Sequence, residues 1–147
     1  VKIDAVIINN GTAALVAGSS VATGFSVDGI EIGAPIDTTA LAIGATRTAT
    51  FNWTATTGTH TILATADKTN VVTEVNETGA DNTKSKNVSV FKPGDANNDN
   101  AVNGADLSIF SFSYGKPGAF TFAQGDFNGD GTVSSADIAI LSFGWGK

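Results

Sequence analysis

Short runs in which apolar and polar residues alternate fill the first 91 positions of the chain, and turn residues separate these runs. Side chains along a strand point to its two faces in turn, so a period of two predicts antiparallel strands rather than helices. Asp28-Gly29 suits the two-residue turn of a β-hairpin. The predicted strands are Lys2–Ile8, Ser20–Val27, Ile30–Ile32, Thr46–Ala55, His60–Ala66, Val71–Val75 and Lys84–Val90. Seven short strands in about 90 residues predict a β-sandwich of immunoglobulin-like architecture.

Bulky residues on one face of the fourth predicted strand indicate where this sandwich is packed. Phe51 and Trp53 share that face, while Asn52 and Thr54 share the other. We expect Trp53 to be a core residue, and the alternative is a platform on which a sugar ring stacks. His60 is the only histidine and the chain has no cysteine, which favours a structural role for its ring over a catalytic or metal-binding one.

The spacing of apolar residues changes to that of helices in the last third of the chain. Two aligned runs, residues 106–115 and 137–146, place large apolar residues at i, i+3 and i+7, which is one face of a helix. Gly115 and Gly146 stand where helices are expected to end. The face predicted to form a shared core comprises Leu107, Phe110 and Tyr114 in the first run and Ile138, Leu141 and Trp145 in the second.

A boundary between the two patterns lies at Phe91-Lys92-Pro93-Gly94. Proline cannot continue a strand ladder, and glycine frees the chain to turn. We therefore expect two domains, an all-β sandwich over residues 1–91 and a small all-α domain over 94–147, joined by a linker at 92–93.

Composition narrows the range of functions. The net charge of −6 argues against nucleic-acid binding, which needs a basic surface. The chain has neither cysteine nor methionine, so we expect no disulfide, zinc–thiolate site, initiator, signal peptide or membrane span. We interpret it as the C-terminal piece of a longer secreted protein that is located outside the cell. No nucleophile and base can be assembled into a site, so we expect no enzyme.

An oxygen-rich loop pattern occurs twice in the last third, beginning at Asp95 and again 31 residues later at Asp126. Ca²⁺ takes six to eight hard oxygen ligands, and a twelve-residue loop supplies them from positions 1, 3, 5, 7, 9 and 12. A single run of this kind is usually a solvated turn, but a duplicate in register favours metal. The sequence predicts two calcium ions, held by Asp95, Asn97, Asp99, the Ala101 carbonyl, Asn103 and Asp106 in the first loop and by Asp126, Asn128, Asp130, the Thr132 carbonyl, Ser134 and Asp137 in the second.

Turns and charges of the two loops support this interpretation. Position 6 must turn sharply, and Asn100 and Gly131 both tolerate positive φ. Position 8 is Val102 or Val133, which we expect to pack where two such loops pair. The six aspartates of 94–147 all occupy loop position 1, 5 or 12, and with two lysines they leave a net charge of −4, which two divalent ions would neutralise. We expect the folding of so small a domain, without disulfides, to be linked to metal, so that the metal-free form is partly or wholly unfolded.

Both loops end in Asp rather than the Glu of EF-hands, and residues 125–131 read Gly-Asp-Phe-Asn-Gly-Asp-Gly. In these motifs residues 94–147 resemble a dockerin, a calcium-binding module of two loop–helix repeats that binds a cohesin domain of a scaffold or surface protein. The resemblance implies paired EF-hand-like calcium loops and a cohesin as partner. It also implies a partner-binding surface made of Gly104, Ala105, Ile109 and Phe112 in the first repeat and Ser135, Ala136, Ile140 and Phe143 in the second. Because the repeats are near copies, a half-turn would present either helix to the same cohesin, and the difference between Gly104 and Ser135 should bias the choice.

Residues 51–55, 58–62 and 70–77 carry a second resemblance. In these segments residues 1–91 are similar to the CARDB family, immunoglobulin-like modules named for cell adhesion in bacteria and archaea. That resemblance implies a spacer, adhesion or accessory module beside secreted hydrolases.

Two functions stay open at this point. In the first, the dockerin binds a cohesin of a cellulosome-like or cell-surface complex, the sandwich spaces it, and upstream modules bind polysaccharide. In the second, the chain is a carbohydrate-binding or cell-adhesion module with the calcium-binding tail as a stabilising cap. Exposed aromatic residues in a line on the sandwich would favour the second, and exposed apolar residues on the helices the first.

An acidic cluster in the sandwich is an alternative third cation site. A solvated turn or a charged strand edge explains it as well. Its members are Asp67, Asn70, Glu74, Asn76, Glu77 and Asp81.

Overall fold

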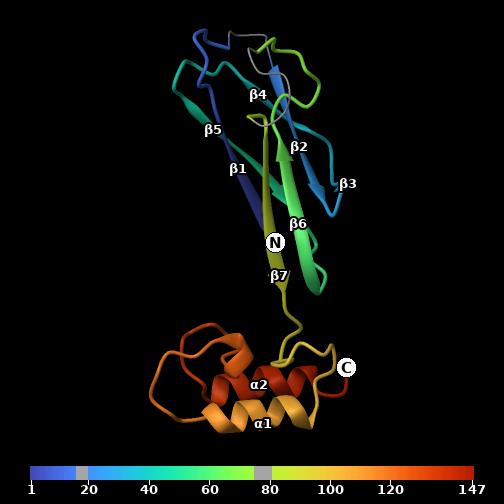
Figure 1. Cartoon of the computed structure of the whole chain (residues 1–147), viewed down its shortest axis with the longest axis vertical. Coiled ribbons are helices and arrows are strands. Elements are labelled where there is room, and N and C mark those ends of the chain that lie inside the picture. The colour runs from blue at the N-terminus through green and yellow to red at the C-terminus, as the bar shows by residue number, and fades with distance from the viewer. Residues whose placement is uncertain (16–19, 75–80) are drawn as a thin grey trace. The chain divides into compact units, whose positions relative to one another are not determined.

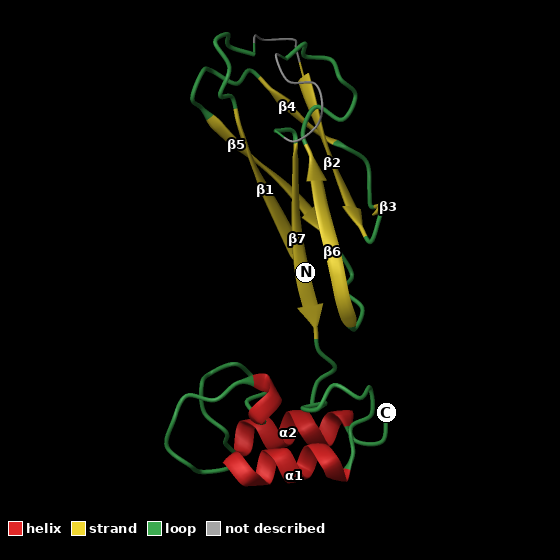
Figure 2. Ribbon diagram, in the orientation of Figure 1, coloured by secondary structure: helices red, strands yellow, loops and turns green. Residues whose placement is uncertain are grey.

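The computed structural model describes residues 1–15, 20–74 and 81–147. The chain divides into two compact units, Val1–Val90 and Phe91–Lys147 (Figure 1). The described part of the first unit contains strands, and the second contains helices (Figure 2). Phe91 belongs to the helical unit, because its ring stacks on that of Phe122 with 4.7 Å between the ring centroids.

Seven antiparallel strands in the described part of the first unit form two sheets. Their bounds are β1 (Lys2–Ile8), β2 (Ser20–Val27), β3 (Ile30–Glu31), β4 (Ile36–Thr39), β5 (Thr46–Asn52), β6 (Gly58–Thr65) and β7 (Thr83–Val90). β1 pairs with β5 in a two-stranded sheet. In the other sheet the first half of β2 pairs with β4 and its second half with β6 and β3, while β7 pairs with β6 along its whole length. A mostly β, two-sheet unit is thus confirmed.

The sandwich is packed by apolar side chains of alternating strand positions. Phe25 and Val27 of β2 are buried, as is Ile62, which stands opposite Val27 on β6. The ring of Phe51 on β5 lies 6.0 Å from that of Phe25, so it joins the two sheets. Among the described residues of this unit, the buried apolar ones are Ala22, Phe25, Val27, Leu41, Ala49 and Ile62.

Three strand predictions differ from the structure. The predicted strand Val71–Val75 is wrong for residues 71–74, which are irregular, and Val75 lies outside the described residues. The reason is Asp67, whose carboxylate accepts the backbone N–H groups of Val71 and Val72 at 3.0 and 2.9 Å and so removes donors that a ladder would use. The second difference is β4, a strand that the sequence pattern does not predict.

The third difference concerns the fourth predicted strand. It ends at Asn52 instead of Ala55, so Trp53 follows β5 and is half-buried rather than a core residue. The predicted alternation itself holds, since Asn52 and Thr54 are exposed.

Two ten-residue helices and one short 3₁₀ helix make up the second unit: α1 (Gly104–Ser113), η1 (Phe122–Gln124) and α2 (Ser135–Gly144). Asn103 and Ser134 cap the two α-helices, each in a capping box with the aspartate three residues later. Gly115 and Gly146 follow the helix ends with φ of 69° and 71°, as predicted for glycine at this position. None of the helices described is long and apolar enough to cross a membrane.

The core of the helical unit contains Val102, Phe110, Val133 and Leu141. The predicted core face is therefore only partly right, because Tyr114, Ile138 and Trp145 are 42 to 50% exposed. Tyr114 and Trp145 lie at the C-caps with extended ψ, beyond the last helical turn. Space near the core is taken instead by Phe120 and Phe127, which pack against it together with Leu107.

His60 of β6 joins three segments of the sandwich. Its Nδ1 lies 2.7 Å from a carboxylate oxygen of Asp28 and its Nε2 lies 2.9 Å from the carbonyl oxygen of Thr56. Both of these oxygens are acceptors, so both ring nitrogens donate only in the imidazolium form. The ring also meets that of Trp53 edge-on, with 4.9 Å between the centroids. Asp28 and Gly29 both have positive φ, as the predicted hairpin turn requires.

We predict that His60 titrates above pH 6.5, because the Asp28 carboxylate and the Thr56 carbonyl raise the pKa of its ring. The same hydrogen bond, with that of the Thr61 N–H, lowers the pKa of Asp28 below 3.8. The histidine's contribution to stability is full below pH 6.5 and is lost as pH rises through the raised pKa. The aspartate's contribution is present above pH 3.8 and is lost as pH falls, so the pair stabilises the sandwich most between these two values.

NMR titration of the single histidine measures this directly. Asp28→Asn should lower the midpoint of His60, whereas Asp4→Asn, which removes a carboxylate bound to Lys2 and Thr50, should leave it unchanged. A wild-type midpoint at or below 6.5 would contradict the imidazolium assignment.

Candidate functional site

Four aspartates of the helical unit are almost completely buried. Asp95 and Asp126 stand at position 1 of the two predicted loops, and Asp106 and Asp137 at position 12; all four are between 0 and 2% exposed. Burying an ionised carboxylate costs several kcal/mol unless partners replace its water. Their surroundings therefore decide what the loops can do.

In the first loop both buried carboxylates accept hydrogen bonds from the backbone. Asp95 accepts the N–H groups of Asp99 and Asn100 at 3.1 and 2.8 Å. Asp106 accepts those of Ala96, Asn97 and Asn103 at 2.9, 3.3 and 2.9 Å. The loop is thus wrapped around its own first and last side chains.

The second loop repeats this pattern 31 residues later. Asp126 accepts the N–H groups of Gly129, Asp130 and Gly131 at 2.8, 3.2 and 2.8 Å. Asp137 accepts those of Phe127, Asn128 and Ser134 at 2.9, 3.1 and 2.9 Å. The predicted register of the duplication therefore extends to individual hydrogen bonds.

Left-handed residues make this wrapping possible. Asn100 and Gly131 at position 6 have φ of 70° and 86°, as predicted. Position 4 adopts the same region, with 58° at Asn98 and 75° at Gly129. Asparagine and glycine are the residues that enter this region most readily, so the loop residue types follow from its geometry.

The other predicted ligands, at loop positions 3, 5, 7 and 9, are not among the buried carboxylates of positions 1 and 12. Asp99 and Asp130 at position 5 are exposed, and each accepts the side-chain N–H of the position 3 residue, Asn97 or Asn128, at 2.9 Å. The backbone N–H of Ala101, then the Asn97 amide, lowers the pKa of Asp99.

In the second loop the Thr132 hydroxyl, then the Asn128 amide, lowers the pKa of Asp130. At position 9 the side chains of Asn103 and Ser134 accept the N–H groups of Ala105 and Ala136 as helix caps. At position 7 Ala101 and Thr132 are exposed and donate their own N–H groups to the position 5 carboxylates. The position 5 carboxylate of each loop is thus bonded to residues of its own loop at positions 3 and 7.

Across residues 1–15, 20–74 and 81–147, no three Asp, Glu, His or Cys side chains are gathered so that they could hold a metal ion. In each loop the structure therefore bonds positions 1 and 12 to backbone N–H groups of that loop, and it bonds positions 3 and 5 to each other.

In the third predicted cluster Asp67 is buried and binds backbone N–H groups, and Glu74 accepts the Asn82 amide at 2.6 Å. Asn70 and Asp81 are exposed, while Asn76 and Glu77 lie outside the described residues.

The structure describes all of residues 91–147, and no lysine in this range forms an ion pair with the four buried loop aspartates. Lys92 donates to the carbonyl oxygens of Asn100 and Lys147 at 2.7 and 2.6 Å. Lys116 and Lys147 place their ammonium groups 3.7 and 3.8 Å from the ring centroids of Phe112 and Phe143. The buried carboxylates consequently have hydrogen bonds but no counter-charge from a side chain.

The two repeats interlock around the core. The N–H of Gly146, after α2, donates to the carbonyl of Val102 in the first loop at 3.0 Å, and the N–H of Gly115, after α1, donates to that of Val133 in the second at 3.1 Å. Gly94 and Gly125, which precede the loops, also lie against the opposite helix. A side chain on Gly94 would come within 2.9 Å of the Cα of Leu141, and one on Gly125 within 2.9 Å of that of Phe110. Each loop is thus seated on the helix of the other repeat.

The predicted partner-binding residues lie on the surface of the two helices. Gly104, Ala105, Ser135 and Ala136 are exposed at the helix starts, and Ile109 and Ile140 are half-buried. Phe112 and Phe143 are 76% and 73% exposed.

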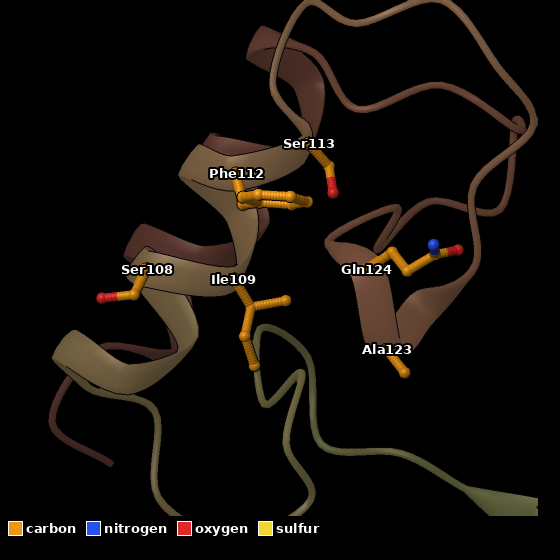
Figure 3. Close-up of a pocket in the computed structure, with 6 residues that line it drawn as sticks. All are labelled: Ser108, Ile109, Phe112, Ser113, Ala123 and Gln124. Carbon is orange, nitrogen blue, oxygen red and sulfur yellow. The ribbon is translucent and has the colours of Figure 1, made fainter.

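Residue-by-residue reasoning missed two features near this surface. One is the pairing of Lys116 and Lys147 with the exposed rings, which i, i+4 spacing on each helix end could have indicated. The other is η1, which lies across from α1 (Figure 3).

Comparisons with known proteins concern mainly the sandwich. A CARDB family model matches residues 1–102, which includes all of the first unit and the start of the first loop. The structure resembles the crystal structure of the CARDB domain of the PF1109 protein from Pyrococcus furiosus, which was determined in complex with di-metal ions. The identity is 27%, with a TM-score of 0.51 over 60% of this chain and 76% of that one. The solution NMR structure of that domain gives 26% and 0.50 over 60% and 77%. No curated protein matches the chain.

We predict that Asp106→Ala destabilises the helical unit by roughly 2–4 kcal/mol, because it leaves three backbone N–H groups without an acceptor and removes half of a capping box. Thermal unfolding in excess chelator, with enough trimethylamine N-oxide added to keep the metal-free helical unit folded, measures this effect by helical circular dichroism. Asp99→Ala is the control, since its carboxylate is exposed, and it should cost much less. Equal losses for the two variants would contradict the anchoring role of Asp106.

Proposed function

The chain belongs to the CARDB family, and on this premise we propose that it is a non-catalytic assembly module of a secreted protein. The CARDB sandwich acts as a spacer in this proposal. The helical unit is a dockerin that binds two calcium ions and attaches the protein to a cohesin of a scaffold or surface protein. The observation that carries the proposal is the pair of loops in matching register, each with two buried carboxylates that form no ion pair with a lysine of the helical unit.

Calcium fits the residues of both loops. Asp95, Asp106 and Asp126 keep a free lone pair after accepting backbone N–H groups, and Asp137 would gain one if the Ser134 hydroxyl, bonded to it at 3.3 Å, turned away. Ca²⁺ prefers such hard oxygen atoms. The amide oxygens of Asn97 and Asn128 and the carboxylates of Asp99 and Asp130 would complete the set of hard oxygen ligands in each loop. A divalent ion would supply the positive charge that neither Lys92, Lys116 nor Lys147 provides to these aspartates.

The distribution of aromatic side chains favours assembly over sugar binding. The aromatic residues of the sandwich are Phe25, Phe51 and Trp53, and none of them is exposed. The rings that are exposed, Phe112 and Phe143 above all, lie on the helical unit. Binding energy in protein interfaces concentrates in a few aromatic anchors, which is the arrangement that these helices offer.

We expect calorimetric titration of the full chain with calcium to give two bound ions. Asp106→Ala and Asp137→Ala should each remove one ion, because each takes away a buried carboxylate from one loop. A stoichiometry that stays at two in either variant, or no calcium-dependent heat for the wild type, would contradict the two-loop assignment.

Folding of the helical unit should follow the metal. Chelation should reduce the helical circular-dichroism signal and leave the sandwich folded, as judged by the NMR signals of Trp53 and His60. A helical signal unchanged in excess chelator would remove the link between calcium and folding.

Binding to a panel of purified cohesin domains tests the assembly function. Surface plasmon resonance with the full chain should show binding in calcium and none in chelator, and the double variant Asp106→Ala/Asp137→Ala should not bind. If no cohesin binds the calcium-loaded protein, the proposed function fails. An assay on polysaccharides should show no turnover.

A further inference from the structure

The two repeats differ at one place where the duplicated sequence leads one to expect the same structure. The last residue of α1 is Ser113 and the last residue of α2 is Gly144, 31 positions later. Both are buried. What lies against each of them decides the shape of the surface beside the exposed phenylalanine.

At Gly144 the chain entering the first loop lies directly on α2. A Cβ atom added there would come within 2.4 Å of the carbonyl oxygen of Pro93 and 3.1 Å of Cγ2 of Val102. The absence of a side chain therefore lets Pro93 close onto the end of this helix.

At Ser113 a side chain occupies the equivalent position, and the chain entering the second loop forms η1 instead. The residue 31 positions after Pro93 is Gln124, whose side chain accepts hydrogen bonds from the N–H and hydroxyl of Thr121 and so closes η1 on itself. An open groove of about 430 Å³ lies between α1 and η1. Figure 3 shows Ile109 and Phe112 on the α1 side and Ala123 and Gln124 on the η1 side.

The chemistry of this groove is apolar with a positive charge beside it. Ile109, Phe112 and Ala123 line it, and the polar residues of its wall, Ser108, Ser113 and Gln124, are uncharged. Lys116 places its ammonium 3.7 Å from the centroid of the Phe112 ring. The only acidic residues of the two helices, Asp106 and Asp137, are completely buried. An otherwise acidic chain thus presents a helical face whose exposed charge is positive, which complements an acidic protein surface.

We propose that docking is one-sided: the α1–η1 groove receives an apolar side chain of an acidic partner surface, Lys116 pairs with a carboxylate beside it, and the face of α2 does not take part. This inference rests on the proposed function, because the partner is the cohesin. It replaces the expectation that either helix can be presented, and it adds Ala123 of η1 as a residue that determines specificity.

Two matched pairs of variants and one further variant distinguish the α1–η1 groove from the face of α2. Phe112→Ala and Phe143→Ala remove rings of nearly equal exposure, so neither should unfold the unit, and each serves as the control for the other. Ala123→Leu fills the groove at an exposed position and leaves both phenylalanines in place. Lys116→Met and Lys147→Met remove the two ammonium groups singly.

The first probe is anilinonaphthalene sulfonate, an anionic aromatic molecule, titrated into the calcium-loaded full chain and followed by amide NMR shifts. We expect shifts at Ile109, Phe112 and Ala123 that Phe112→Ala and Ala123→Leu abolish and Phe143→Ala leaves unchanged. Equal shifts around Phe143, or none at the groove, would overturn the inference whether or not a cohesin has been found.

The second probe is any cohesin that binds in the panel described above. Phe112→Ala and Ala123→Leu should each weaken binding by about tenfold or more, and Phe143→Ala by less than about threefold. Lys116→Met should reduce the salt dependence of the affinity, and Lys147→Met should not. Equal losses on both faces would overturn one-sided docking and leave the proposed function standing, whereas no binding by any cohesin fails the proposed function and leaves the dye titration to decide.

Discussion

The helical unit depends on four buried aspartate side chains that hold backbone N–H groups. Each loop of this unit has almost no regular structure, and its amide groups have few other acceptors. Asp95 and Asp106 collect five of these donors in the first loop, and Asp126 and Asp137 collect six in the second. A negative charge is what makes such clusters of donors favourable, and the same charge makes the clusters costly to bury. The loops are therefore irregular segments held by many hydrogen bonds to buried carboxylates, and a cation would offset the cost of burying those charges.

The sandwich obtains its order differently. Its fully buried side chains are few, and strand pairing with a joint between Phe25 and Phe51 holds its sheets. Polar contacts add to this at the turns. Asp28 connects the β2–β3 hairpin to His60, and Asp67 closes the turn after β6. In both units, then, single aspartates fix the conformation of turns and loops by hydrogen bonds, whereas larger domains can rely more on an apolar core.

Local patterns predicted well those features that local physics determines. Alternation located β1, β2, β6 and β7 to within a few residues, and oxygen spacing identified the loop positions that the structure buries. These patterns failed where a contact between residues distant in sequence determines the local structure. β4 follows Pro35 and reads Ile-Asp-Thr-Thr, which has no alternation, and only its pairing with β2 makes it a strand. In the helical unit the positions of Phe120 and Phe127 against the core depend on how the connector returns, and no helical period contains that information.

The two repeats exchange contacts, because the loop of each lies against the helix of the other. Each loop is held by its own aspartates and also rests on the helix of the other repeat, so part of what stabilises one copy is supplied by its neighbour. A single loop and helix would find the same surfaces on a second molecule of itself, related by a two-fold axis, and such isologous contacts are the commonest way in which identical chains associate. The unit thus has the two-fold arrangement that two copies of one loop and helix would adopt as a homodimer. Within a single chain the two halves need not be identical, and Ser113 and Gly144 are one buried pair of positions at which they differ.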